Sequence, residues 1–192
     1  MIDFKSKGYV IGVDEAGVGP LAGPVVAAAI LVDESIMDIA VKDSKLLSAA
    51  RREELLEVIS EKYKYCISIV EPSVIDKINI LNATKKAMTM AISELRQLGD
   101  YPVYVDGNRM PFEDNKMEAI VKGDVLLKPI SAASILAKVT RDAIMFRLSE
   151  KHPQYGWERN AGYGTKAHIK AIKEFGSTDQ HRRSFLRNII TI

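Results

Sequence analysis

The chain has 192 residues, of which 47% are hydrophobic and 27% are charged, and its formal net charge at pH 7 is only +2. That length and composition fit one globular domain with a core of its own. A single cysteine excludes an intramolecular disulfide and a zinc site made of cysteines. No apolar run reaches the length of a membrane span and the first residues do not resemble a signal peptide, so we expect a cytoplasmic protein with no membrane partner.

The charges are unevenly distributed along the chain. Residues 151–192 contain eight basic and three acidic residues, a net charge of +5, whereas residues 1–150 carry −3. A protein that holds metal ions in one part and a polyanion in another would show this asymmetry. A solvated basic helix face would show it as well, and charge alone does not separate the two interpretations.

Hydrophobic periodicity predicts two strands at the start of the chain and then strands that alternate with helices. Ser48 is the expected N-cap of the first helix. This order predicts an α/β fold, a mixed sheet covered by helices, in a single domain of residues 1–192 whose part from about 151 to 192 forms a small helical appendage. In chain order we expect strands at 9–13 and 25–32, a helix at 46–62, a strand at 65–70, a helical turn at 73–77, a helix at 83–98, strands at 101–105 and 119–122, a helix at 130–148, a loop at 153–164, and helices at 166–175 and 181–188.

The glycine-rich segment that joins the first two predicted strands contains two adjacent carboxylates, Asp14 and Glu15. Successive side chains of a strand point to opposite faces, so the two carboxylates share one direction only if the strand ends there. Burying two carboxylates among apolar strands is unfavourable without a partner cation. Because hard cations such as Mg²⁺ prefer carboxylate oxygens, the pair predicts a divalent metal site.

Two further acids lie at the ends of predicted strands, each next to a glycine: Asp106 before Gly107, and Asp124 after Gly123. In open sheets with helices on their faces, ligands gather at strand ends. Four carboxylates that converge there would hold two divalent ions about 4 Å apart, an arrangement that serves in-line displacement at phosphorus. Aspartate beside glycine also forms ordinary turns, and for either residue alone that interpretation would be preferred.

Two other phosphate-binding loops fit the glycine-rich segment less well. Residues 17–22 match the GxGxxA form of a dinucleotide-binding turn, which needs a helix that starts there. Pro20 and Pro24 instead flank a run that continues as a strand, and the upstream carboxylates would repel phosphate unless a metal screens them. The phosphate loop of actin-like ATPases also follows an early strand, but those proteins need two such domains and this chain is too short for both.

Short motifs occur almost from end to end of the chain. They are VDEAG and GPLAGP within residues 13–24, DSK at 43–45, NIL and AT within 79–84, DG at 106–107, KGD at 122–124, SAASILAKV and RD within 131–142, GYGT at 162–165, and HRRSF at 181–185. Each motif alone is weak, but their joint order and spacing are highly specific. Together they resemble ribonuclease HII, the type 2 ribonuclease H, in its bacterial form.

The resemblance implies an RNase H-like fold, a five-stranded mixed sheet flanked by helices with a C-terminal helical part. It implies an endoribonuclease that hydrolyses the RNA strand of RNA–DNA hybrids and cuts 5′ to single ribonucleotides embedded in duplex DNA, leaving 3′-hydroxyl and 5′-phosphate ends. The expected partners are therefore an RNA–DNA hybrid duplex and a DNA duplex that contains ribonucleotides, and we expect the protein to be a monomer.

The family's catalytic, metal-binding acids map onto the four acids chosen above, Asp14, Glu15, Asp106 and Asp124. Two divalent ions, Mg²⁺ or Mn²⁺, are the expected cofactors. Asp142 is a rival for the fourth position, but it lies inside a predicted helix, and we expect it to be structural and paired with a nearby base.

Recognition of RNA depends on one sugar hydroxyl, the 2′-hydroxyl, which both donates and accepts hydrogen bonds. The turn Gly17-Val18-Gly19 is the expected binding element, because glycine backbone approaches a sugar closely. The resemblance implies that Tyr163 packs against the same sugar; without it, a loop aromatic covering the core would be the preferred interpretation. The family usually has arginine at position 18, where it contacts phosphate. With valine there, we expect recognition of the 2′-hydroxyl to survive and the phosphate contact to weaken.

Phosphate contacts are expected from Lys45, Ser134, Lys138, Arg182 and Arg183. Such contacts position a duplex without reading its sequence. An exposed, solvated side chain is the alternative for each lysine, and it is the weaker alternative for Lys138 because that residue lies in an otherwise apolar helix. The three histidines lack metal-ligand spacing, and we expect no catalytic role for them.

Two other functions compete with that of a ribonuclease. One is a nucleic-acid-binding protein of the same fold that no longer cuts; the intact set of four acids argues against it, and only Val18 supports it. The other is a nuclease of the same fold that acts on DNA. The Gly17–Gly19 turn and Tyr163, as the resemblance interprets them, argue against that function.

Overall fold

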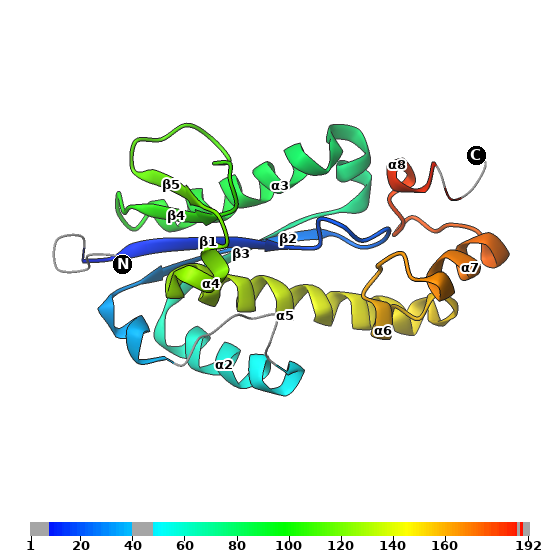
Figure 1. Ribbon diagram of the computed structural model, residues 1–192, viewed down its shortest axis with the longest axis horizontal. Coiled ribbons are helices and arrows are strands. Elements are labelled where there is room, and N and C mark those ends of the chain that lie inside the picture. The colour runs from blue at the N-terminus through cyan, green and yellow to red at the C-terminus, as the bar shows by residue number, and fades with distance from the viewer. Residues whose placement is uncertain (1–7, 40–47, 188, 190–192) are drawn as a thin grey trace.

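The computed structural model describes residues 8–39, 48–187 and 189 of the chain. Five strands form one sheet in the order β3-β2-β1-β4-β5 (Figure 1). The β1–β2 and β2–β3 pairs are antiparallel, and the β1–β4 and β4–β5 pairs are parallel, so the expected five-stranded mixed sheet is confirmed. The strands are β1 (Val10–Ala16), β2 (Val25–Val32), β3 (Lys64–Val70), β4 (Val103–Asp106) and β5 (Met117–Ile120).

Helices cover both faces of this sheet. Figure 1 shows α3 on one side and α5 on the other, with α2 beyond α5, while α6, α7 and α8 gather at one end of the molecule. Among the described residues, no helix is both long enough and apolar enough to cross a membrane. The helices are η1 (Glu34–Asp38), α2 (Ala49–Lys62), α3 (Pro72–Arg96), α4 (Gly123–Leu126), α5 (Lys128–Lys151), η2 (Pro153–Tyr155), α6 (Trp157–Asn160), α7 (Lys166–Phe175) and α8 (Arg183–Leu186).

The central strands are buried on both faces and divide their side chains between two apolar layers. Along β1, Val10 joins the cluster under α2 and α5, whereas Ile11 and Val13 join the cluster under α3. At Gly12 the backbone of α5 comes very close: a Cβ on that glycine would lie 2.2 Å from the carbonyl carbon of Pro129. Helix α5 can therefore lie directly against β1, and this contact brings the residues of its first turns to the end of the strand.

A third apolar cluster joins the C-terminal elements to the loop between β1 and β2. The side chains Leu21 and Ala22 of that loop pack with Met145 of α5 and with Trp157 and Ile172 from the last elements. The backbone N–H of Leu21 also donates to the carbonyl of Gly162 at 2.8 Å. The C-terminal part therefore packs against the glycine-rich segment.

Most predicted elements are present, several of them with shifted ends. The N-cap at Ser48 is confirmed, because its hydroxyl accepts a hydrogen bond from the N–H of Arg51 at 3.2 Å. The turn and helix predicted at 73–77 and 83–98 form one helix, α3, interrupted by a kink at Asn79, where φ is +65°. The Asn79 side chain accepts the N–H of Asn82 at 3.0 Å and so caps the second half. The loop predicted at 153–164 contains η2 and α6.

Candidate metal centre and nucleic-acid site

Three aspartates converge at the carboxyl ends of two neighbouring parallel strands. Val13 of β1 pairs with Val105 of β4, so Asp14 and Asp106, the next residues, lie side by side. Asp124 comes from the first turn of α4, and its backbone N–H donates to Oδ1 of Asp106 at 3.3 Å. Carboxylate oxygens of the three residues all lie within 4.8 Å of one another. Such a set of oxygen donors fits a hard divalent cation.

Burial makes this cluster electrostatically unfavourable without a cation. Asp14 and Asp124 are almost completely buried. Burial raises the pKa of Asp14 well above its ordinary value, and the charges of Glu15 and Asp106 raise it further. A hydrogen bond from Ser134 and another from the Glu15 N–H, at 2.7 Å, act in the opposite direction without compensating. A bound cation would favour the ionised form of Asp14.

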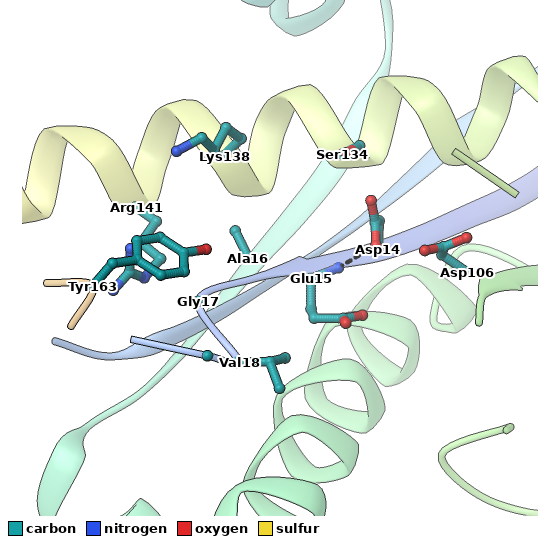
Figure 2. A pocket seen from close by; sticks show the side chains of 11 residues that line it. Asp14, Glu15, Ala16, Gly17, Val18, Asp106, Ser134, Lys138, Arg141 and Tyr163 are labelled. Atoms are coloured by element: carbon teal, nitrogen blue, oxygen red, sulfur yellow. Dashed lines mark hydrogen bonds between the residues drawn. The ribbon is translucent and has the colours of Figure 1, made fainter. Parts of the chain in front are cut away.

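Glu15 belongs to the same pocket but not to the cluster of three. Strand β1 continues to Ala16, which pairs with Val26 of β2, so neighbouring side chains still alternate at this position. Figure 2 shows the carboxylate of Asp14 directed toward Ser134 on α5 and that of Glu15 directed the other way. Of the four acids predicted to bind metal, the structure therefore brings three together and leaves Glu15 at the pocket wall.

The pocket is a cavity of about 280 Å³ whose wall continues from the aspartates to the glycine-rich turn. Gly17 has φ +95°, and a Cβ there would lie 2.1 Å from Nε of Arg141, so only glycine fits. Val18 is 40% exposed and Tyr163 is 47% exposed on the far wall. The Tyr163 ring lies against Gly19, 3.6 Å from the position of its missing Cβ. The predicted sugar-binding elements thus share one pocket with Asp14 and Asp106.

Two of the predicted phosphate contacts, Ser134 and Lys138, also line this pocket, and both have acidic partners. Ser134 donates a hydrogen bond to the carboxylate of Asp14. Lys138 forms an ion pair with Asp142 at 2.6 Å, and Asp142 lies 4.0 Å from Arg52. The expectation that Asp142 pairs with a nearby base is confirmed. Lys45 lies outside the described residues.

Arg182 is not the surface residue that was expected. Its side chain is completely buried, and its guanidinium donates to backbone carbonyls of the glycine-rich segment, including those of Gly17 and Val18. It therefore cannot reach a phosphate, and that expectation is wrong. Arg183 is exposed, its backbone N–H donates to Asp76 at 2.9 Å, and it is not among the described residues that line the pocket.

Arg141 also lines the pocket, although none of the sequence patterns above marks it as a site residue. Its side chain is 1% exposed, lies under Gly17 and borders the pocket. The available signal was an arginine inside a long, alanine-rich apolar helix, a position where a charged side chain needs several hydrogen-bond acceptors.

Two of the three histidines lie in contact with each other in the interior of the C-terminal part. His168 and His181 are buried, with their Nε2 atoms 3.2 Å apart, although their spacing in the sequence gave no sign of this. Trp157 donates its Nε1–H to Nε2 of His168 at 3.0 Å. Burial, followed by the charges of His168 and His152, lowers the pKa of His181 to about 4. Neither buried histidine lines the pocket described above.

Comparisons with known proteins agree on one family. A sequence profile described as Ribonuclease HII matches residues 11–188. A ribonuclease HII of Orientia tsutsugamushi (strain Boryong) is 54% identical over 176 residues, which are 92% of this chain and 85% of that protein. One of Rickettsia africae (strain ESF-5) is 52% identical over 188 residues, 96% of each chain. The crystal structure of ribonuclease H2 from Pyrococcus horikoshii OT3 is similar at a TM-score of 0.77 and 30% identity, covering 94% of this chain and 96% of the other.

Proposed function

Because the chain belongs to the ribonuclease HII family, and is thus a ribonuclease H that acts on RNA–DNA hybrids, we propose that it also cuts duplex DNA at single embedded ribonucleotides. The cut falls 5′ to the ribonucleotide and leaves 3′-hydroxyl and 5′-phosphate ends. One observation carries this proposal: Asp14 and Asp106 share a pocket with the Gly17–Gly19 turn and Tyr163. A phosphodiester held at the aspartates therefore has its sugar beside the turn.

Asp14, Asp106 and Asp124 would hold two divalent ions, Mg²⁺ or Mn²⁺, with Glu15 contributing from the wall of the pocket. The support is the donor set, three carboxylates with oxygens within 4.8 Å of one another in a buried place. When bound, a pair of such ions supplies an activated water and stabilisation of the leaving oxygen. Ser134 orients the Asp14 carboxylate, and the Glu15 N–H holds one of its oxygens.

The protein's own groups select and orient the substrate. The backbone of Gly17–Gly19 would contact the 2′-hydroxyl, and the Tyr163 ring would pack on the sugar. Lys138 would move from Asp142 to a phosphate, since its side chain is 36% exposed at the pocket edge. We propose that one chain acts alone, as a single-domain monomer, because β1, α5 and the loop that carries Tyr163, all from the same chain, line the pocket.

The first test is cleavage of an end-labelled DNA duplex that carries one ribonucleotide, with Mg²⁺ and separately with Mn²⁺. An all-DNA duplex and a long RNA–DNA hybrid are the parallel substrates. Asp14→Asn removes a proposed metal ligand, and Asp100→Asn, which neutralises an exposed carboxylate paired with Lys116, is the matched control.

A single cut 5′ to the ribonucleotide, lost in Asp14→Asn and kept in Asp100→Asn, is the expected result. Cleavage of the hybrid but not of the duplex with a single ribonucleotide would contradict the proposed recognition of that ribonucleotide. Valine at position 18 would then be the first candidate cause. Binding of every duplex without cleavage would favour the binding protein instead.

A further inference from the structure

Two buried arginines meet beneath the turn that faces the pocket. Arg141 comes from the middle of α5 and Arg182 from the residue before α8, and their side chains are 1% and 0% exposed. All hydrogen bonds found for Arg141 go to backbone carbonyls: Nε donates to Pro24 at 3.0 Å, one terminal nitrogen to Ala22 at 3.1 Å, and the other to Ala161 at 3.0 Å.

The guanidinium of Arg182 also donates hydrogen bonds to backbone carbonyls of the glycine-rich segment. Its Nε donates to the carbonyl of Gly23 at 2.9 Å, and one terminal nitrogen donates to that of Val18 at 3.0 Å. The other terminal nitrogen donates to the carbonyls of Gly17 at 2.6 Å and Pro24 at 3.1 Å. The planar, forked guanidinium is suited to such a set of fixed acceptors, and a lysine could not reproduce it.

The nearest acidic charges act on the two guanidiniums only from a distance: that of Asp142 on Arg141 and that of Asp76 on Arg182. Among the described residues, no carboxylate forms an ion pair with Arg141 or Arg182. Burial, followed by the charge of Arg141, lowers the pKa of Arg182 to about 9, which still leaves it charged at neutral pH. Two positive charges are therefore fixed under the turn, and the backbone carbonyls that accept their hydrogen bonds offset part of the cost of burying them.

The hydrogen bonds of Arg182 to the turn also determine where the N–H groups of Val18 and Gly19 point. In a trans peptide the C=O and the N–H point opposite ways. The carbonyls of Gly17 and Val18 point at Arg182, so the N–H groups of Val18 and Gly19 point away from it. Both residues line the pocket, and no hydrogen bond from either N–H to another described residue is found. The turn thus has two donors that point away from Arg182, at residues that line the pocket.

We propose that Arg141 and Arg182 are positioning residues that hold the carbonyls of the turn inward, so that the N–H groups of Val18 and Gly19 face the substrate. Their two charges add an attractive potential for the adjoining phosphate, in a chain where position 18 itself is uncharged. This proposal rests on the proposed function, because the turn must read the ribonucleotide for its shape to matter.

The test measures ribonucleotide preference, the ratio of the dissociation constants for an all-DNA duplex and for the same duplex with one ribonucleotide. Fluorescence anisotropy with Mg²⁺ in an Asp14→Asn background prevents cleavage. Arg182→Lys keeps the charge but loses the fork, so we expect the preference to fall about tenfold, the value of one hydrogen bond, with affinity for all-DNA duplex unchanged. Arg182→Gln also loses the charge and weakens binding of both duplexes.

Ile172→Ala is the matched control, because Ile172 is a buried residue of the same C-terminal cluster that makes no hydrogen bond to the turn. If Ile172→Ala lowers the melting temperature about as much as the Arg182 variants do, it should still keep the ribonucleotide preference. Arg141→Lys provides a second test if the Arg182 variants do not fold.

The outcomes separate the two proposals. If the parent protein shows the ribonucleotide preference and both lysine variants retain it, the positioning role alone is overturned. The same holds if Ile172→Ala loses the preference as strongly as the lysine variants do. A parent protein that binds both duplexes equally would overturn the proposed ribonucleotide recognition, and the positioning role with it.

Discussion

At the scale of single residues, the buried carboxylate of Asp14 is expected to lower the free energy of unfolding of the protein when no metal is bound. Its carboxylate is buried between Ser134 and two other acids. Replacing it by asparagine removes the charge and keeps the shape. We therefore expect Asp14→Asn to raise the melting temperature by several degrees in the presence of a chelator, measured by calorimetry.

The same variant should respond differently to metal. Mg²⁺ should raise the melting temperature of the parent protein, because the ion binds only the folded state, and should leave that of Asp14→Asn nearly unchanged. Asp100→Asn is again the control, with an exposed carboxylate. If Mg²⁺ stabilised Asp14→Asn as much as the parent protein, the cluster would not be the metal site.

Val18 gives a second prediction at this scale. It is exposed in the pocket, so a longer side chain has room there. Val18→Arg should tighten binding of a ribonucleotide-containing duplex several-fold and increase the slope of log Kd against log salt by about 1, the contribution of one added phosphate contact. Val18→Met is the matched control for length without charge. Unchanged affinity and slope in the arginine variant would contradict the prediction.

Residue chemistry in the sequence was enough to choose the acids but not to place the arginines. Asp14, Asp106 and Asp124 were found because acids after apolar strands are conspicuous. Arg182 was misjudged because a basic residue in a basic segment suggests a surface. The carbonyls that bury it lie about 160 residues earlier in the chain, and only the folded chain brings them together.

At the scale of elements, the approach of α5 to β1 determines where Ser134 meets Asp14. That approach depends on Gly12, since a Cβ would lie 2.2 Å from the backbone of Pro129. We expect Gly12→Ala to reduce the free energy of unfolding by about 2 kcal/mol, because the helix must move away. Denaturant unfolding measures this effect.

Gly19→Ala is the control for stability, because a Cβ there makes only an ordinary contact with the Tyr163 ring. A cost at Gly12 no greater than at Gly19 would mean that the helix adjusts without strain.

Elements were predictable where periodicity is strong and less so where tertiary contacts decide. The helix at 166–175 was predicted with its correct ends, and its N-cap, Thr165, accepts a hydrogen bond from the His168 N–H. The kink at Asn79 joins two predicted pieces into one helix, and α6 is a single turn whose Trp157 packs in the C-terminal cluster. The strand order 3-2-1-4-5, which makes β1 and β4 neighbours, depends on contacts distant in sequence.

At the scale of the whole molecule, a chain of buried hydrogen bonds links the C-terminal segment to the pocket wall. The Thr178 N–H donates to Nδ1 of His181 at 3.0 Å, and Nε2 of His181 lies 3.2 Å from Nε2 of His168. Nδ1 of His168 lies 2.9 Å from the carbonyl of Tyr163. Because Nδ1 of His181 accepts a hydrogen bond, a second proton on this ring would break the chain.

This arrangement predicts a loss of stability in acid. Burial and two neighbouring histidines lower the pKa of His181 from 6.5 to about 4, and Asp179 opposes the shift only in part. Between those values the unfolded state binds more protons than the folded state, so stability falls as the pH decreases from 6.5 to 4, by at most about 1 kcal/mol per pH unit. Melting temperatures across this range test it, and His181→Gln should show a shallower decline; an equal decline would contradict the assignment.

The dependence of the turn on Arg182 has a consequence for the order in which the protein becomes competent during synthesis. All three clustered aspartates are synthesised at least 58 residues before Arg182, whose guanidinium donates to the carbonyl of Gly17. A chain interrupted before residue 182 would therefore contain the three aspartates but lack the side chain that donates to the carbonyls of Gly17 and Val18. If Arg182 positions the turn as proposed, selectivity for the ribonucleotide is complete only after this segment has been made and has packed against the turn.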